Sequence, residues 1–128
     1  MVIDTSALIA ILTDEAERAS FIAKIGADPV RLMSAASLVE ASLVMDSRRG
    51  EAGGHEIDLF LHRAAIEIVA VDLDQCAIAR RALRHFGRGR RAARLNYGDL
   101  FAYALAKTTG EPLLFKGTDF ALTDIAAA

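Results

Sequence analysis

Short apolar runs alternate with longer amphipathic stretches along the chain, which is the pattern of an α/β protein. Residues of buried-strand type occupy 1–3, 29–33, 66–71 and 111–115. Apolar residues recur at helical spacing from residue 7 onward and within 14–26, 34–49, 55–64, 72–86 and 99–107. Because parallel strands need long crossover connections, this alternation predicts a mainly parallel sheet with helices on both faces.

Capping residues and glycines predict where several of these helices begin and end. The hydroxyls of Thr5 and Ser6 are suited to cap a helix that starts near residue 7, and Ser34 is suited to cap the helix that runs to residue 49. The glycine pair at 53–54 predicts a turn before the next helix. Residues 87–93 are predicted to form a flexible basic connection.

Length and composition narrow the class of protein further. A chain of 128 residues, 53% of them hydrophobic, fits one domain at 1–128 with strands buried on both faces. Charged residues interrupt every apolar run before it reaches the ~18 residues needed to cross a bilayer. The first strand begins at Met1 and meets an acid at residue 4, unlike a secretory signal. With Cys76 as the single cysteine, we expect a soluble cytoplasmic protein without disulfides.

Four acidic residues stand inside or directly beside apolar runs: Asp4, Glu40, Asp99 and Asp119. Acidic side chains are seldom buried unless they are paired or bind a metal ion. Asp4 and Asp119 follow predicted strands, and in open α/β sheets ligands bind at the carboxyl ends of strands. Glu40 and Asp99 can project over the same edge if their helices begin there. The sequence therefore predicts one shared metal site.

The oxygen-rich character of this set indicates which metal and which chemistry. Hard carboxylate ligands suit Mg²⁺ or Mn²⁺, whereas the three histidines lack the spacing of zinc ligands. One or two such ions can activate water and stabilise charge on a phosphodiester, so hydrolysis of phosphodiester bonds is the expected reaction. Ser6 and Thr118 are candidate supporting residues that can donate hydrogen bonds to the carboxylates or to the substrate.

Each acid also has a structural explanation. Asp4 can act as a helix cap, Asp99 can favour a helix N-terminus electrostatically, and Asp119 can stabilise a turn. Glu40, in the middle of a predicted helix, is the hardest of them to explain structurally.

A phosphatase or receiver-like domain would also place an aspartate after the first strand, but a haloacid-type phosphatase would need a second aspartate where Ser6 stands.

The net charge of −2 hides a basic cluster ahead of the Asp99 segment. Its members are Arg80, Arg81, Arg84, Arg88, Arg90, Arg91 and Arg94, with no acidic residue among them. Such a cluster either contacts a phosphate backbone or forms a solvated helix face, and the sequence favours neither.

In order and spacing, the acidic segments resemble the motifs of the PIN-domain ribonucleases, and in detail those of the VapC toxins of bacterial type II toxin-antitoxin pairs. The matching segments are residues 2–8, 38–40, 95–104, 112–120 and 123–125. The resemblance covers nearly the whole chain and implies a PIN-like α/β fold, a three-layer sandwich with a central, mainly parallel sheet.

The resemblance also implies roles for residues. Asp4 and Asp99 would bind Mg²⁺ directly, while Glu40 and Asp119 would complete the catalytic cluster through water or a second ion. Ser6 would support the residues that bind the ion directly. Thr118 departs from the family, whose members commonly carry Asn or Asp there. Asp124 matches a frequent acidic position, although a structural hydrogen bond explains it equally well.

The family further implies the partners: an RNA substrate, a cognate antitoxin that blocks the site, and a second copy of the chain in a homodimer. In this setting the arginine cluster would contact RNA phosphates or the antitoxin. The expected activity is therefore a Mg²⁺-dependent endoribonuclease that acts as a toxin. The alternative is a catalytically silent PIN-like module that binds RNA or a partner.

Overall fold

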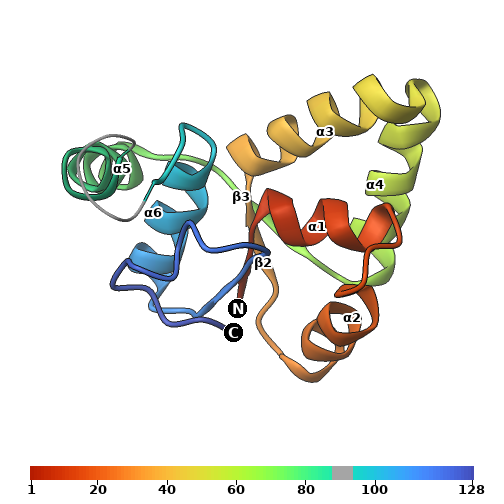
Figure 1. Ribbon diagram of the computed structural model, residues 1–128, viewed down its shortest axis with the longest axis horizontal. Coiled ribbons are helices and arrows are strands. Elements are labelled where there is room, and N and C mark those ends of the chain that lie inside the picture. The colour runs from red at the N-terminus through yellow and green to blue at the C-terminus, as the bar shows by residue number, and fades with distance from the viewer. Residues whose placement is uncertain (88–93) are drawn as a thin grey trace.

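The computed structural model describes residues 1–87 and 94–128, which form a four-stranded sheet between two layers of helices (Figure 1). In chain order the elements are β1 (Val2–Ile3), α1 (Thr5–Leu12), α2 (Arg18–Ala27), β2 (Leu32–Ser34), α3 (Ala35–Arg49), α4 (Glu51–Arg63), β3 (Glu67–Val69), α5 (Leu73–Phe86), α6 (Asp99–Thr109) and β4 (Leu113–Leu114). The strand order is β3-β2-β1-β4 and every pairing is parallel. The predicted α/β class, with a parallel sheet flanked by helices, is confirmed.

Alternate residues of the two central strands enter two separate cores, because successive side chains of a strand point to opposite faces. Ile3 and Leu114 pack with α1, α3 and α4, whereas Val2 and Leu113 pack with α5 and α6. All four side chains are almost completely buried. Figure 1 shows the same division, with α5 and α6 on one side of the sheet and α1 to α4 on the other. The high apolar content of the chain fills these two cores.

The strand order fixes where a ligand site can form. From β1 the chain crosses to β2 on one side, and β4 returns to pair with β1 on the other, so β1 lies between them. A crevice at the carboxyl ends of strands is expected at such a switch point. Asp4 directly follows β1 and therefore stands at that crevice.

The starts of the first two helices differ from the sequence prediction. The first helix begins at Thr5, because Asp4 itself is the cap and its side chain accepts a hydrogen bond from the Ser6 amide. The second helix begins at Arg18 and not near residue 14, because Asp14 has a left-handed backbone with φ of 59° that cannot continue a helix. The helix capped by Ser34 is as predicted, and Ser34 accepts from the Ala36 amide.

The turn predicted at residues 53–54 is wrong, because both glycines lie inside α4. A Cβ atom on Gly53 would stand 2.7 Å from the carbonyl oxygen of Met45, whereas one on Gly54 would meet nothing within 4 Å. Gly53 therefore serves the close packing of α3 against α4. The turn lies earlier, at Gly50, whose φ of 60° suits glycine.

Two further expectations concern the basic connection at 87–93 and the absence of a helix that could span a membrane. The basic connection predicted at 87–93 lies outside the described residues except for Gly87, as do Arg88, Arg90 and Arg91. Within residues 1–87 and 94–128, no helix combines the length and apolar character needed to cross a membrane.

Candidate active site

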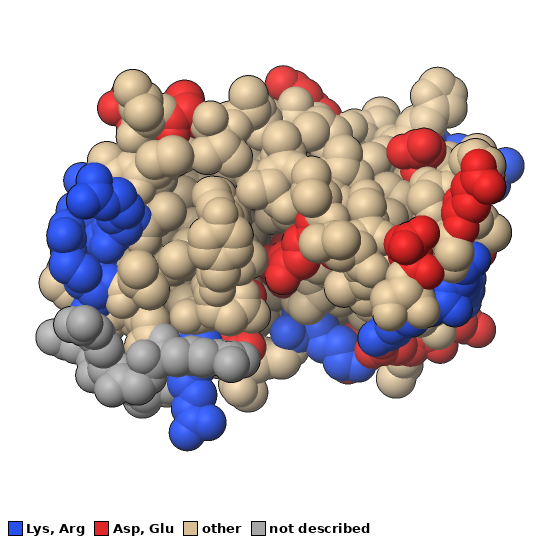
Figure 2. All heavy atoms as spheres, turned by 90° about the horizontal axis from the view of Figure 1, so that it is seen from above, with Lys and Arg blue, Asp and Glu red and all other residues tan. Residues whose placement is uncertain are grey.

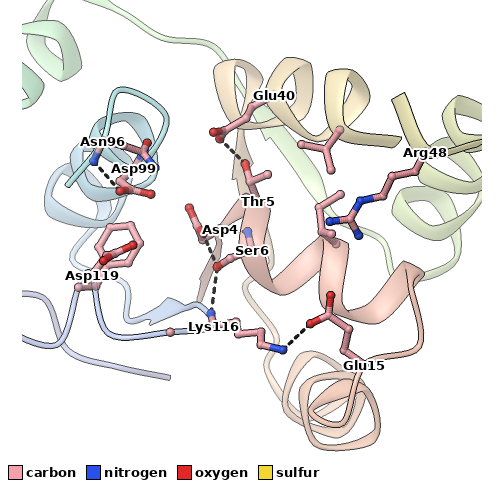
Figure 3. A pocket seen from close by; sticks show the side chains of 14 residues that line it. Asp4, Thr5, Ser6, Glu15, Glu40, Arg48, Asn96, Asp99, Lys116 and Asp119 are labelled. Carbon is pink, nitrogen blue, oxygen red and sulfur yellow. Dashed lines mark hydrogen bonds and ion pairs between the residues drawn. The ribbon is translucent and has the colours of Figure 1, made fainter. Parts of the chain in front are cut away.

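A cavity of about 460 Å³ opens at the carboxyl ends of β1 and β4, and all four predicted acids line it (Figure 3). They come from different parts of the chain: Asp4 follows β1, Glu40 lies on α3, Asp99 is the first residue of α6, and Asp119 lies on the segment after β4. Figure 3 shows Asp4, Asp99 and Glu40 around one open space, with Asp119 below Asp99. The fold thus brings together acids that are up to 115 positions apart in the sequence, from Asp4 to Asp119.

Asp4 is held by the first turn of α1. Its Oδ2 accepts hydrogen bonds from the Ser6 amide at 2.9 Å and from the Ser6 hydroxyl at 2.6 Å. The other carboxylate oxygen, Oδ1, is buried and has no hydrogen-bond partner among the described residues. Burial raises the pKa of the Asp4 carboxyl, and the hydrogen bonds from Ser6 oppose that rise only in part.

Asp99 is fixed at the N-terminus of α6 by a reciprocal pair of hydrogen bonds with Asn96. The Asn96 amide donates to Asp99 Oδ2 at 2.6 Å, and the Asp99 amide donates to Asn96 Oδ1 at 3.0 Å. Burial raises the pKa of Asp99 to about 7, and the negative charges of Asp4, Asp119 and Glu40 add to the rise. The pKa of Asp99 therefore depends on the charges of the other three acids.

Glu40 reaches the cavity from the second turn of α3. Its Oε2 accepts a hydrogen bond of 2.7 Å from the Thr5 hydroxyl, which lies beside Asp4 in the chain. Gly98 lies against the Glu40 carboxylate, where a Cβ atom would stand only 2.2 Å from Oε1. The carboxylate of Glu40 thus faces the cavity and accepts a hydrogen bond there. This explains why an acid stands in the middle of a helix among apolar residues.

Asp119 lies on the segment that follows β4, which is tied to the first turn of α1. The Lys116 amide donates to the Ser6 hydroxyl oxygen at 2.9 Å, so Ser6 joins this segment to Asp4. Phe120 anchors the segment in the core and packs against Phe115 with ring centroids 5.1 Å apart. Asp119 itself is exposed at the mouth of the cavity.

Charged residues of the opposite sign stand at the other end of the same cavity. The Lys116 ammonium forms ion pairs with Glu15 and, at 3.0 Å, with Glu17. Arg48, in the last turn of α3, also lines the cavity. In Figure 3 Arg48 lies on the side of the cavity away from Asp99 and Asp119. The site is therefore acidic at one end and contains basic groups at the other.

The donor chemistry of the acidic end fits a divalent cation. The free Oδ1 of Asp4 and the raised pKa of Asp99 both describe carboxylates that lack a compensating positive charge. Oxygen donors of this kind are those that Mg²⁺ and Mn²⁺ prefer. As the side chains lie, no three His, Cys, Asp or Glu residues in the described part of the chain are grouped closely enough to hold one ion. The cavity thus presents separate donors around a shared space.

The other predicted residues have different positions. Ser6 lies in the cavity, as described, whereas Thr118 is exposed and is not among its lining residues. Asp124 lies elsewhere, where it accepts hydrogen bonds from the Tyr103 hydroxyl at 2.7 Å and from Lys107 at 2.9 Å. These contacts correspond to the structural explanation that the sequence left open for Asp124.

The described arginines of the basic cluster lie outside the cavity. They are Arg80, Arg81, Arg84 and Arg94, and all four are exposed. In Figure 2, basic side chains gather at the left edge of the molecule, over α5. The basic surface of α5 is therefore separate from the basic end of the cavity.

Sequence reasoning missed several residues of this site. The hydroxyl of Thr5, which suits a helix cap, holds Glu40, and Gly98, which carries no chemical group, makes room for that carboxylate. The sequence does not predict Arg48, Lys116 or Glu15 as residues of this site, because residues that meet only through tertiary contacts carry no local signal. The motif around Asp99 offered one hint, since Asn96 three residues earlier is a typical capping residue.

Comparison with known proteins defines the class to which this fold and site belong. The family model described as "PIN domain" matches residues 1–126. The chain is 59% identical over 127 residues to the protein named "Ribonuclease VapC" of Mycolicibacterium smegmatis, covering 99% of this chain and 98% of that one. The chain therefore belongs to the VapC family of PIN-domain ribonucleases.

Two solved structures share the fold at low sequence identity. Mycobacterium tuberculosis VapC20, described as a Sarcin-Ricin loop cleaving toxin, has a TM-score of 0.81 at 17% identity and covers 99% of this chain and 97% of that chain. VapBC2 from Rickettsia felis, bound to a DNA fragment from its promoter, has a TM-score of 0.78 at 12% identity, with coverage of 99% and 96%. The three-layer arrangement is thus that of solved VapC structures.

Proposed function

We propose that the protein is a Mg²⁺-dependent endoribonuclease that acts as the toxin of a toxin-antitoxin pair, with Mn²⁺ as an alternative ion. The observation that carries the proposal is the meeting of four carboxylates in one cavity, two of them, Asp4 and Asp99, with raised pKa values. An uncompensated cluster of this kind favours a divalent cation. Full-length similarity to VapC ribonucleases supports RNA as the substrate.

In this proposal Asp4 and Asp99 hold the ion directly, and Glu40 and Asp119 complete the site. Bound Mg²⁺ would offset the repulsion among the carboxylates, help to activate water and stabilise the negative charge that develops on the phosphate during hydrolysis. Ser6 fixes the orientation of Asp4 through two hydrogen bonds to one oxygen, which leaves Oδ1 for the ion. The backbone amide of Asn96 fixes the orientation of Asp99 through one hydrogen bond to Oδ2.

Glu40 is the best candidate to accept a proton from the attacking water. Its Oε2 is engaged by the Thr5 hydroxyl, so Oε1 is the atom left for that proton. Asp119 lies at the exposed mouth of the cavity and in this proposal orients water or a second ion. Thr118 and Asp124 have no part in the proposal, because neither lines the cavity.

The partners follow from the same family. The substrate is RNA, the inhibitor is a cognate VapB-type antitoxin, and the active form is a homodimer in the bacterial cytoplasm. The relative of known structure from Rickettsia felis is itself a VapBC complex, which supports the antitoxin.

The exposed arginines of α5 are proposed to contact RNA phosphates away from the cavity. Replacing Arg80, Arg81 and Arg84 together with Gln is expected to weaken RNA binding for all sequences alike and to flatten its salt dependence. Unchanged RNA binding with weaker antitoxin binding would assign the cluster to the antitoxin.

The proposal is tested by the variants Asp4→Asn and Asp99→Asn, which keep the shape of the side chains and remove their charge. Purified protein should cleave total bacterial RNA in Mg²⁺ and not in EDTA, and each variant should lose at least ~100-fold of that activity and no longer arrest growth. Asp58→Asn is the matched control, because Asp58 is an exposed aspartate of α4 outside the cavity. RNA binding without any Mg²⁺-dependent product would instead identify a silent binding module.

A further inference from the structure

The cavity has a second charged end that the proposed metal chemistry does not use. Arg48 lines this end from the last turn of α3, and Ile9 and Val44 line the wall beside it. The acids Asp99 and Asp119 stand at the opposite end, so the cavity has opposite charges along its length (Figure 3).

Arg48 differs from the cations around it in its partners. Lys116 is engaged by Glu15 and Glu17, which offset its charge. Arg49, the next residue of α3, forms an ion pair with Glu56. Within the described ranges 1–87 and 94–128, the Arg48 side chain forms no ion pair or hydrogen bond. The hydrogen bond from Lys116 is the main cause of the lowered pKa of Glu15, and the nearby Arg48 charge adds to it. Among the described residues that line the cavity, Arg48 is therefore the cation available to a ligand.

We propose that Arg48 binds the RNA phosphate next to the one that is cleaved. The inference rests on the proposed function, because it takes the acidic end as the place of cleavage. RNA carries a negative charge at every nucleotide, so a strand with one phosphate at the acids must bring a neighbouring phosphate along the cavity. A guanidinium presents a rigid fork of donors that matches two phosphate oxygens.

The repulsion between the acids and the RNA is a second reason to assign Arg48 to phosphate binding. Four carboxylates repel a polyanionic substrate, and a cation at the far end of the cavity reduces that repulsion and orients the strand. Glu15 is the acid that shares this end, but its ion pair is with Lys116 and not with Arg48, so the donors of the Arg48 guanidinium remain open to the substrate. Arg48 is thus a substrate-binding residue and takes no part in proton transfer.

The experiment compares Arg48→Gln with Arg49→Gln. The two arginines are adjacent in α3 and both exposed, but only Arg48 lines the cavity. The probe is a synthetic RNA that spans a cleavage position mapped from the fragments that the wild-type protein produces. Arg48→Gln should lower kcat/KM by about 10- to 100-fold, the value of one charge-assisted hydrogen-bonded contact. The slope of log kcat/KM against log salt should fall by about 0.7, as for one phosphate contact to a single strand.

Arg49→Gln should leave both quantities at the wild-type values, and Arg48→Lys should restore the salt slope while recovering only part of kcat/KM. A second arm replaces one phosphate beside the cleaved position by an uncharged methylphosphonate. With the wild-type protein, the methylphosphonate should lower kcat/KM by the same factor as Arg48→Gln does with unmodified RNA. With the Arg48→Gln variant, the methylphosphonate should not lower kcat/KM any further.

The inference would be overturned if Arg48→Gln and Arg49→Gln had the same kcat/KM and the same salt slope. It would also be overturned if the loss of kcat/KM from Arg48→Gln were fully additive with the loss from every neighbouring methylphosphonate, since Arg48 would then act through Glu15. In both cases wild-type cleavage remains, and the proposed function stands. Absence of wild-type cleavage would instead remove the proposed function, and the role of Arg48 with it.

Discussion

The carboxylate of Glu40 fills the place where a side chain at Gly98 would begin, with 2.2 Å between Oε1 and the position of a Cβ atom. This contact joins α3 to the segment that leads into α6. It lets Glu40 and Asp99 face the same cavity although they belong to opposite helical layers. A glycine that no chemical motif would single out thus decides where a carboxylate stands.

Gly98→Ala is expected to separate activity from stability. The added methyl group must displace the Glu40 carboxylate, which is the end of a flexible side chain, so the free energy of unfolding should change by less than ~1 kcal/mol. RNA cleavage should fall by about tenfold or more, because Glu40 loses its position at the cavity. Urea unfolding and a cleavage assay on the same protein check this. A variant with full activity would show that the position of Glu40 does not matter to the reaction.

Gly53 and Gly54 provide a matched pair that tests the packing of α3 against α4. Gly53→Ala should lower the free energy of unfolding by about 1–3 kcal/mol, because its Cβ would stand 2.7 Å from the Met45 carbonyl oxygen. Gly54→Ala meets open space and should raise it by about 0.5–1 kcal/mol, the difference in helix propensity. Urea denaturation measures both. Similar effects from the two variants would contradict the close approach at Gly53.

Ser6→Ala should weaken metal binding without removing a metal ligand. The variant loses the 2.6 Å hydrogen bond from the hydroxyl to Asp4 Oδ2 and the acceptor of the Lys116 amide, but it keeps the hydrogen bond from the Ser6 amide. Because that hydroxyl orients Asp4, the Mg²⁺ concentration for half-maximal activity should rise by about tenfold, which corresponds to ~1.4 kcal/mol. Ser42→Ala is the control, since the Ser42 hydroxyl donates to a carbonyl within α3. Equal Mg²⁺ dependence in the two variants would exclude this role for Ser6.

The stability of the metal-free protein should fall as pH rises towards neutrality. The pKa of Asp99 is about 7 in the folded chain, above its ordinary value of 3.8. Between these two values the folded state binds a proton that the unfolded state does not, so Asp99 favours folding at low pH and loses this contribution as pH rises to about 7.

Asp99→Asn removes that dependence and keeps the hydrogen-bonding shape. In EDTA the variant should be more stable than the wild type by about 1–2 kcal/mol at pH 7.5, a range reduced for solvent screening, and the gain should vanish near pH 4. Mg²⁺ should stabilise the wild type more at pH 7.5 than at pH 5, because the ion competes with the proton. Thermal unfolding across pH, with and without Mg²⁺, measures both effects. A pH-independent gain would show that repulsion at Asp99 is not its cause.

The parts of the fold that local chemistry determines were predicted from the sequence. Ser34 caps its helix as a serine at that position is expected to, and the short apolar strands pair in parallel as their crossovers require. Where tertiary packing overrides local preference, the prediction was wrong. The glycines at 53–54 read as a turn because glycine is a poor helix former, yet Gly53 is needed where α4 approaches Met45.

The same distinction holds for the candidate site. The meeting of the four acids could be anticipated, because Asp4 and Asp119 follow strands that end at one edge of the sheet. The groups that hold them could not, since the contact of Thr5 with Glu40 joins residues 35 positions apart and depends on how α1 packs against α3. Charges that come from separate helices, as at Arg48, likewise become visible only in three dimensions.

The carboxylate of Asp4 caps α1 and also lines the cavity. A substitution of Asp4 in a living cell can therefore affect the stability of the protein, its activity, or both. If bacteria that escape growth arrest carry changes at this codon, they should fall into two groups. An asparagine keeps the cap, and the inactive protein should accumulate to its normal level. An alanine or valine removes the cap as well, and the destabilised chain should be depleted by proteases. Protein abundance in escaped cells would then report which of the two duties was lost.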